Sequence, residues 1–346
     1  MTRSARKLIR DYAYRHVGGA ALVLLYHRVA DLDWDPQQLA VSRDNFVAQM
    51  RILSRRYRVL PLQELVDGLR RRRVPDGAIA VTFDDGYADN LHNAAPALAE
   101  FSVPATVFVS SGFVGAAREF WWDELDCIVL SPGTLPVEIE LAVGRARFSA
   151  ILAESHQHSA ADASQDVSWS VEDPGGTERQ RLYRELCAFV RPLPADDRTE
   201  ALAQLRAAAN APAHARSGHL PLSTTDVRTL ASHPYVDLGG HTVSHQMLSA
   251  RSADEQRIEI AADRAALAEM LGHAPRLFSY PYGSLDSYTA ETVDIVRETG
   301  YEGACSNHPG VVKPWTDPYR IPRYLVRDWD AETLAERIDG WFDDPQ

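Results

Sequence analysis

Two adjacent carboxylates and a pair of histidines are the residues of this chain whose types and spacing could do chemistry. Asp84 and Asp85 directly follow the apolar run at residues 78–83 and precede Gly86. Carboxylates placed side by side repel each other, so a bound cation or a raised pKa would relieve the repulsion. The plainer interpretation is an Asp-Gly turn at the end of a strand, which is common and needs no ligand.

His241 and His245 are four residues apart and follow a second apolar run at residues 236–240. If a helical turn begins there, both imidazoles lie on one face and can bind one metal ion. Together with one carboxylate of the Asp84–Asp85 pair they would supply three ligands and leave a position open. That arrangement is typical of catalytic rather than structural zinc sites. The other carboxylate would then be free to act as a base on water.

The elements that must position these residues are buried strands alternating with amphipathic helices. Continuous apolar runs bounded by turn residues predict strands of a parallel sheet, and apolar stripes with capping residues predict helices. Ligands bind at the carboxyl ends of such strands, so the Asp pair, the His pair and His27 are expected near one another. A structural role explains His27 equally well. The expected strands are residues 21–26, 78–83, 104–110, 236–240, 276–281, 302–306 and 324–326, and the expected helices are residues 42–57, 61–69, 88–101, 224–232, 252–271, 287–299 and 331–342.

The regular alternation stops between about residues 115 and 222. Helical patterns at residues 178–190 and 198–209 and a strand-like run at 137–141 predict a mostly helical insertion that sits on the barrel or sheet. Trp121 and Trp122, near its start, have two interpretations. They cover apolar core, or they form a flat wall on which a sugar stacks.

Composition and charge exclude several classes of protein. The net charge of −12 over 346 residues argues against a nucleic-acid binder. Basic clusters at Arg3–Arg10 and Arg70–Arg73 are interpreted as solvated helix surface, and a weak peripheral membrane contact by the N-terminal arm stays open. Cys127, Cys187 and Cys305 form neither a disulfide framework nor a cysteine zinc site. No signal peptide or membrane-length segment is recognised, so a cytoplasmic location is expected.

Three motifs carry a resemblance to a known family: Thr82-Phe83-Asp84-Asp85-Gly86, His241-Thr242-Val243-Ser244-His245 and Tyr280-Pro281-Tyr282-Gly283. They resemble, in this order, signature motifs of the polysaccharide deacetylases, also called NodB-homology or carbohydrate esterase family 4 enzymes. Residues 25–29 (Leu-Tyr-His-Arg-Val) look like the start of the bacterial exopolysaccharide-associated branch. The resemblance covers about residues 20–114 and 222–330. It implies an α/β fold, a distorted (β/α)7-type barrel, in one catalytic domain over residues 1–346 that the insertion at about 115–222 interrupts.

The resemblance also implies roles and an activity. A single divalent metal would be bound by Asp85, His241 and His245, with Asp84 as the catalytic base. The backbone N–H of Tyr282 would donate to the developing oxyanion. Zinc suits these ligands best, and cobalt or nickel would also fit. The implied reaction is hydrolytic removal of an N-acetyl group from an amino sugar or glycan; the alternatives are an O-acetyl esterase, a sugar deformylase, or a catalytically silent carbohydrate-binding protein.

Two positions depart from the family pattern. Ser279 stands where many members have an arginine that pairs with the catalytic aspartate, and no Leu-x-His motif, which carries the general acid, follows Gly283. Arg323 could replace the missing cation, although a surface or structural ion pair explains it equally well. His27 or His308 could supply the acid. The sequence does not predict an oligomeric state.

Overall fold

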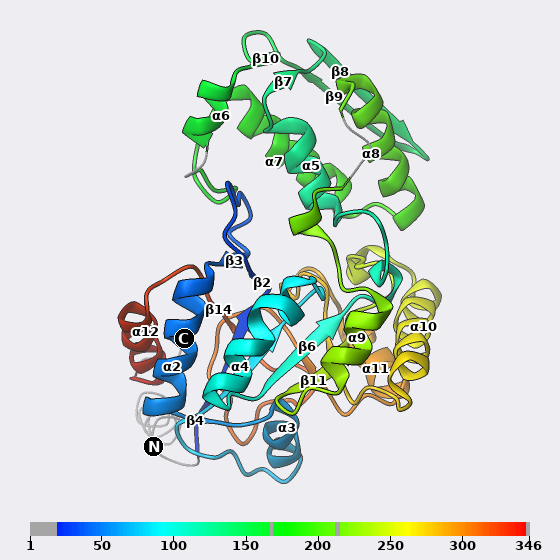
Figure 1. The fold of residues 1–346 in the computed structure, drawn as a ribbon. Helices are drawn as coiled ribbons and strands as arrows, with labels where there is room; N and C mark the ends of the chain where they lie inside the picture. The colour runs from blue at the N-terminus through cyan, green and yellow to red at the C-terminus, as the bar shows by residue number, and fades with distance from the viewer. Residues whose placement is uncertain (1–18, 167–168, 212–214, 344–346) are drawn as a thin grey trace, which may run out of the picture.

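The core of the fold is a curved sheet of parallel strands, seen in a computed structural model that describes residues 19–166, 169–211 and 215–343 (Figure 1). Its strands are β1 (Ala21–Tyr26), β4 (Arg58–Val59), β5 (Ala78–Phe83), β6 (Ala105–Val109), β11 (Val236–Gly240), β12 (Leu277–Ser279), β13 (Gly303–Cys305) and β14 (Tyr324–Leu325). They run in the order β13-β12-β11-β6-β5-β1-β14, and β4 pairs with the beginning of β5. A bridge from Cys305 to Ile321 connects β13 to the segment that leads into β14. The predicted α/β class with a distorted (β/α)7-type barrel is confirmed.

The pairing of β1 with β5 shows how the sheet prepares the site. Every side chain of both strands is buried, as expected for parallel strands that are covered on both faces. Ala21 pairs with Ala78 and Tyr26 with Phe83, so the two strands end level with each other. The Asp84 N–H donates to the Tyr26 carbonyl at 3.0 Å. The residues that follow β1 and β5 therefore emerge side by side.

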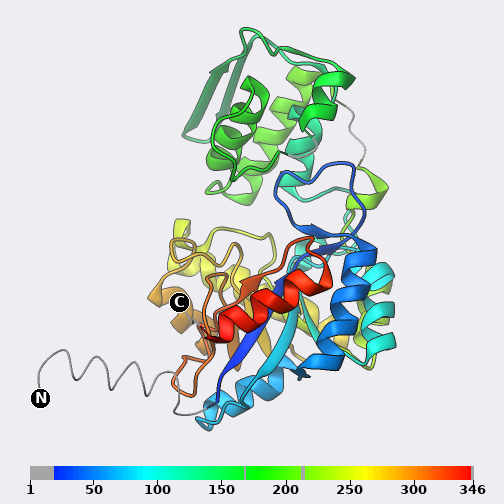
Figure 2. The same cartoon turned by 90° about the vertical axis from the view of Figure 1, so that its left-hand side faces the viewer.

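Helices cover the outside of the sheet (Figures 1 and 2). They are α2 (Arg43–Arg56), α3 (Leu62–Arg70), α4 (Ala95–Phe101), α9 (Thr224–Ala231), α10 (Ala253–Leu271), α11 (Ala290–Glu298) and α12 (Ala331–Asp343). The starts of the helices predicted at 224–232 and 252–271 are confirmed, since Ser223 and Ser252 each cap the helix in a capping box. The helix predicted at 88–101 is confirmed, and its first part is a π-helix, Asn90–Ala94. One predicted boundary is wrong, since α11 begins later than predicted because Thr289 caps it.

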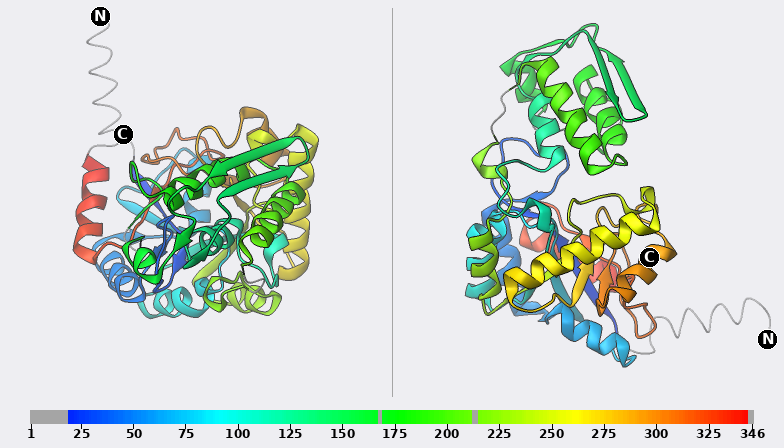
Figure 3. Two further views of the ribbon diagram at one scale, coloured as in Figure 1. Left: turned by 90° about the horizontal axis from the view of Figure 1, so that it is seen from above. Right: turned by 90° about the vertical axis from the view of Figure 1, so that its right-hand side faces the viewer.

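The described residues between 121 and 209, here called the middle segment, lie above the barrel (Figure 1; Figure 3, left). They pack around an apolar core that includes Leu125, Leu141 and Leu186 and that Tyr87 and Phe113 also join. The segment is mostly helical, as predicted. The strand predicted at 137–141 is half of an antiparallel hairpin whose first strand alternates exposed and buried side chains. The elements are α5 (Trp121–Val129), β7 (Gly133–Thr134), β8 (Glu138–Val143), β9 (Ala146–Ile151), β10 (Gln157–His158), α6 (Ala160–Asp166), α7 (Glu178–Val190) and α8 (Ala195–Ala209).

Several other predictions concern the chain as a whole. Among the described residues, no helix combines the length and apolar character needed to cross a bilayer. The basic cluster Arg3–Arg10 and the helix considered there lie outside the described residues, whereas Arg70–Arg73 are exposed at the end of α3. The cytoplasmic location and the grouping of residues 1–346 into one catalytic domain stay predictions.

Candidate metal centre and catalytic site

The carboxyl ends of the barrel strands bring the predicted site residues to one cavity of about 460 Å³. Ligands bind at this end of the strands in barrel folds and open α/β folds. The cavity lining includes the predicted residues His27, Asp84, Asp85, His241, His245 and Tyr282.

Asp85, His241 and His245 form a compact set of ligand atoms. Nε2 of His241 lies 3.4 Å, and Nε2 of His245 3.3 Å, from the same oxygen, Oδ1 of Asp85. One ligand atom from each residue lies within 4.8 Å of the others, and all three residues are buried. One carboxylate oxygen with two imidazole nitrogens suits Zn²⁺, and also Co²⁺ or Ni²⁺. The residues therefore fit a divalent metal, whose identity stays a prediction.

The two histidines do not converge through a helical turn, and the sequence-based expectation is wrong here. Residues 241–245 form a bent loop rather than a helix. Thr242 (φ 64°) and His245 (φ 50°) adopt the left-handed conformation, as do Asp85 (φ 76°) and Tyr282 (φ 63°). Residues with a Cβ rarely adopt it, and it persists only where the surroundings hold it in place. A strained backbone at the strand ends, not helical periodicity, aims these side chains.

Contacts behind the two histidines fix their orientation. His241 Nδ1 lies 2.7 Å from the Ser279 carbonyl oxygen, so a proton on Nδ1 leaves the Nε2 lone pair for a metal. The backbone N–H of His241 donates to the carboxylate of Asp263 in α10 at 3.0 Å. Arg198 of α8 donates from Nη1 to the His245 carbonyl at 3.1 Å. The barrel thus holds one histidine, and the middle segment helps to hold the other.

Local electrostatics set the protonation states of the three candidate ligands. Burial raises the pKa of Asp85, but hydrogen bonds from His241 and His245 outweigh burial and leave the pKa below its usual value. Burial lowers the pKa of His245 to about 4, so its imidazole is neutral at neutral pH. Burial by itself would lower the pKa of His241. The negative charges of Asp84 and Asp85 outweigh burial, so the pKa of His241 lies above its usual value. A metal would have to displace that proton, because only a neutral imidazole is a ligand.

Asp84 is held by the arginine that was considered as its partner. Arg323 donates from Nη1 to Oδ1 of Asp84 at 2.7 Å and from Nη2 to Oδ2 at 2.6 Å, a buried bidentate pair. Ser279 Oγ donates to the same carboxylate at 3.1 Å and accepts from Arg323 at 2.9 Å. Burial raises the pKa of Asp84, but Arg323 and His241 lower it to below its usual value. Asp84 is therefore ionised at neutral pH.

The two histidines considered as the general acid lie in different places. His27 lines the cavity, and its Nδ1 is buried with no hydrogen-bond partner among the described residues. Burial lowers its pKa, although nearby carboxylates act in the opposite direction. His308 is absent from the cavity lining, and its carbonyl accepts the Arg323 N–H at 3.0 Å. The geometry favours His27 over His308, and its catalytic role stays a prediction.

Trp121 and Trp122 are each 5% exposed and belong to the apolar core of the middle segment. They also border the cavity. The Trp122 ring packs edge-on against that of His245 with centroids 4.9 Å apart, and its Nε1–H donates to the Tyr87 hydroxyl at 2.8 Å. Trp121 donates to the Tyr282 hydroxyl at 3.1 Å. Core packing, the commoner of the two predicted uses, explains their burial, and the wall on which a sugar stacks stays a prediction.

The sequence interpretation did not find Arg191, Arg198 or Asp263. The two arginines lie in the middle segment, outside the three motifs, and no local pattern marks them. Asp263 did carry a signal, because it lies between Ile260 and Leu267 on the buried face of α10. A carboxylate at such a position needs hydrogen-bonding partners.

A family model described as polysaccharide deacetylase matches residues 71–136 and 204–304. The chain belongs to the polysaccharide deacetylase family. This polysaccharide deacetylase chain is 30% identical over 95 residues to YxkH of Bacillus subtilis, a curated protein named after the same family. The match covers 27% of the present chain and 33% of YxkH, so it spans a third of that relative.

Solved structures of two proteins share the fold of this polysaccharide deacetylase chain. The deacetylase PplD of Streptococcus pyogenes, solved in complex with acetate, has a TM-score of 0.57 at 15% identity, over 93% of this chain and 99% of PplD. IcaB from Ammonifex degensii has a TM-score of 0.58 at 19% identity, over 94% of this chain and 98% of IcaB.

Proposed function

We propose that this member of the polysaccharide deacetylase family is a metal-dependent hydrolase that removes an N-acetyl group from an amino sugar or glycan. The observation that carries the proposal is the buried set of Asp85, His241 and His245 beside the ion-paired Asp84 in one cavity. A silent carbohydrate-binding protein would have no use for two adjacent buried carboxylates, which are costly to desolvate. The acetate complex of PplD and the solved de-N-acetylase from Aggregatibacter actinomycetemcomitans, which shares the fold at 14% identity, add support.

In this proposal Asp85, His241 and His245 bind a divalent metal. The metal supplies Lewis-acid chemistry, because it polarises a carbonyl group and lowers the pKa of water. The three side chains would hold the metal beside Asp84, which lines the same cavity. Three protein ligands would leave a coordination position free, as in other catalytic sites of this kind.

The remaining groups move protons and hold charge. Asp84 accepts the proton of the attacking water, while Arg323 keeps its carboxylate oriented. The Tyr282 backbone N–H donates to the oxygen that becomes negatively charged when the carbonyl is attacked. His27 donates the proton that the departing amine needs. The same groups would serve an O-acetyl ester or an N-formyl amide, so the amide and the acetyl group are the finer part of the proposal.

Product release on matched substrates tests this function. The purified protein is incubated with an N-acetylated, an O-acetylated and an N-formylated amino-sugar oligosaccharide, before and after chelation and after added Zn²⁺. We expect acetate from the N-acetylated substrate, loss of release after chelation, and recovery with metal. Release only from the ester or only of formate would select the alternative reactions. Binding without any release would favour the silent protein, and release that survives complete metal removal would reject the metal.

A further inference from the structure

The cavity that holds the candidate metal ligands also contains Arg191, which forms no ion pair with an acidic side chain among the described residues. Arg191 directly follows α7 and lines the cavity. Its Nη2 donates to Ser284 Oγ at 3.1 Å, and its Nε is buried without a hydrogen-bond partner among the described residues. A hydrogen bond from Ser284 lowers the pKa of Asp286, and the charge of Arg191 lowers it to a smaller extent. Asp286 is exposed, however, and within the described ranges no ion pair joins Arg191 to a carboxylate.

The other charged side chains of the cavity are balanced. Arg323 neutralises Asp84, and Arg327 lies 2.8 Å from Glu172. In the proposed function the charge of the Asp85 carboxylate is compensated by a divalent cation. Arg191 thus adds a positive charge that the cavity does not compensate, in a chain whose net charge is −12. A guanidinium in this position favours a ligand that brings its own negative charge, because charge-assisted hydrogen bonds to carboxylate or phosphate are strong.

Arg191 lies one side chain away from the metal centre. Its guanidinium is over the Tyr282 ring, 4.3 Å from the centroid. The same ring packs against the His245 imidazole with centroids 4.7 Å apart. A sugar whose amide reaches the metal centre would therefore bring a substituent of its own ring, or of the neighbouring sugar, to Arg191.

We infer that Arg191 is a specificity-determining residue that binds an anionic group of the substrate, so that the preferred substrate is an acidic rather than a neutral acylated glycan. The inference rests on the proposed function and narrows its substrate class. The shared chemistry is a set of negatively charged oxygens that accept N–H bonds from the guanidinium. A uronic acid next to the amino sugar would supply them as a carboxylate, and a glycosyl phosphate would supply them as a phosphate.

A different role for Arg191 predicts a different result. If its contact with Tyr282 only held that ring in place, loss of the guanidinium would affect every substrate equally. The matched variants are Arg191→Gln, which removes the charge, and Arg181→Gln, which removes an exposed arginine from α7, the helix that Arg191 follows. Each is compared with the wild type on a neutral N-acetylated oligosaccharide, on one with an adjacent uronic acid, and on one with a glycosyl phosphate.

We expect R191Q to lower kcat/KM on at least one acidic substrate by about tenfold or more, mainly through KM, as for the loss of a hydrogen bond between charged groups. Any loss on the neutral substrate, through the contact with Tyr282, should be much smaller, so the ratio of acidic to neutral kcat/KM should fall, and R181Q should keep the wild-type ratio. The acidic substrate on which R191Q loses activity shows whether Arg191 binds a carboxylate or a phosphate. Equal loss on neutral and acidic substrates, or no loss on either acidic one, would overturn the inference.

A binding measurement separates this inference from the proposed function. Calorimetric titration of the metal-loaded wild type and R191Q with the same oligosaccharides needs no turnover. Weaker binding of an acidic oligosaccharide by R191Q, without hydrolysis by either protein, would reject the proposed hydrolase and retain the assignment of Arg191. Equal binding by both proteins would reject the assignment, whatever their activity.

Discussion

Asp84 and Asp85 are neighbours in the chain whose carboxylates meet different partners. Both oxygens of Asp84 accept from Arg323, whereas Oδ1 of Asp85 faces Nε2 of His241 and His245. The left-handed backbone at Asp85 turns the two side chains apart. Each negative charge therefore has its own compensation, and both carboxylates stay ionised despite burial.

Replacing Asp84 with Asn should separate catalysis from metal binding. Asn keeps the shape of the side chain but cannot accept a proton from water, so turnover should fall by about a hundredfold or more. Metal content, measured by elemental analysis, should match the wild type, because the three candidate ligands are unchanged. Ser279→Ala is the control, since it removes one hydrogen bond to the same carboxylate and one from Arg323 but leaves Asp84 able to accept a proton. Wild-type turnover in the Asn variant would refute the assignment of Asp84 as the base.

The sequence predicted the residues of the site better than their connections. The carboxylates after residues 78–83 and the imidazoles after residues 236–240 could be recognised because buried apolar runs locate the strands. Arg323 could be offered only as one of two interpretations. Its partner Asp84 is 239 residues away in the chain, and tertiary structure alone decides such a pairing.

At the scale of elements, strands and capped helices were predictable and loops were not. β1 and β5 are apolar throughout because both of their faces are covered, which leaves little ambiguity in the sequence. The loop after β11 looked like a helical turn because its histidines are four residues apart. Positive φ values at Thr242 and His245 are maintained by tertiary contacts, and a threonine or histidine in the sequence does not predict a positive φ.

One of these contacts gives a prediction for the middle segment. Arg198 is 4% exposed and donates to the carbonyl oxygens of Ser244 and His245. Arg198→Met would leave both acceptors unpaired and loosen the loop, so the affinity for metal should fall by about tenfold, the lower end of what outer-shell contacts contribute. Competition with a chromogenic chelator measures this affinity.

The control for this variant is Arg206→Met on the same helix. Arg206 pairs with Glu124 at 2.7 Å and does not line the catalytic cavity. Both variants lose one partly or fully buried arginine of α8, but only Arg198 contacts the metal-binding loop. Equal metal affinities in the two variants would show that α8 does not support the centre.

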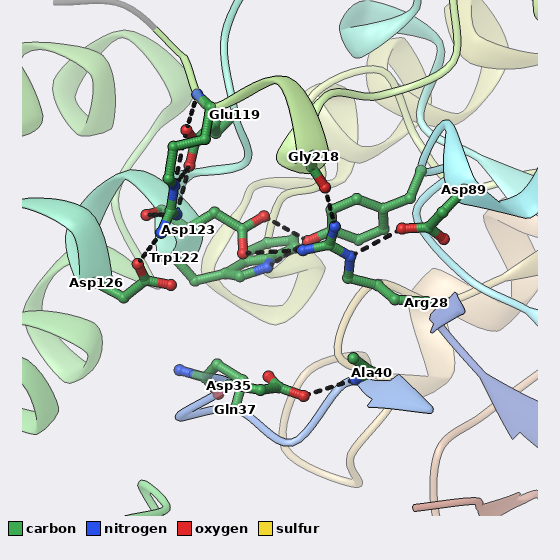
Figure 4. A network of polar contacts seen from close by, with 12 residues as sticks. Arg28, Asp35, Gln37, Ala40, Asp89, Glu119, Trp122, Asp123, Asp126 and Gly218 are labelled. Atoms are coloured by element: carbon green, nitrogen blue, oxygen red, sulfur yellow. Dashed lines mark hydrogen bonds and ion pairs between the residues drawn. The ribbon is translucent and has the colours of Figure 1, made fainter. Parts of the chain in front are cut away.

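For the molecule as a whole, a buried polar network connects the middle segment to the barrel (Figure 4). Arg28 of the short strand β2 (Arg28–Val29) donates to Asp89 at 3.1 Å and lies 3.9 Å from Asp123 of α5. The Tyr87 hydroxyl donates to Asp123 at 2.7 Å and accepts from Trp122 at 2.8 Å. The network therefore runs from the barrel to the tryptophan that packs against His245. No sequence motif marks it, because its members are scattered along the chain.

The same network has more carboxylates than arginines. Arg216 lies 2.6 Å from Glu119 and 2.9 Å from Asp126, which also accepts from Trp34 at 3.3 Å. Burial raises the pKa of Asp123 well above its usual value, although Arg28 opposes the shift. Burial raises the pKa of Asp126 from 3.8 to about 7, although Arg216 opposes the shift. The network thus holds protons that the unfolded chain would release near pH 4.

Asp126 therefore gives the protein a pH-dependent stability that one substitution should remove. A folded-state pKa above the unfolded value means that the folded state binds this proton more tightly, so its stabilising contribution is complete below about pH 4 and is lost as the pH rises to about 7. Relative to Asp126→Asn, the wild type should lose up to about 1.4 kcal/mol of unfolding free energy per pH unit across that window. Urea unfolding at several pH values measures both curves.

Asp330→Asn is the control for this variant. Hydrogen bonds from Thr333 lower the pKa of Asp330, so the contribution of Asp330 to the unfolding free energy is constant above pH 5. Parallel curves for the wild type and D126N would mean that Asp126 is already ionised in the folded protein at acidic pH.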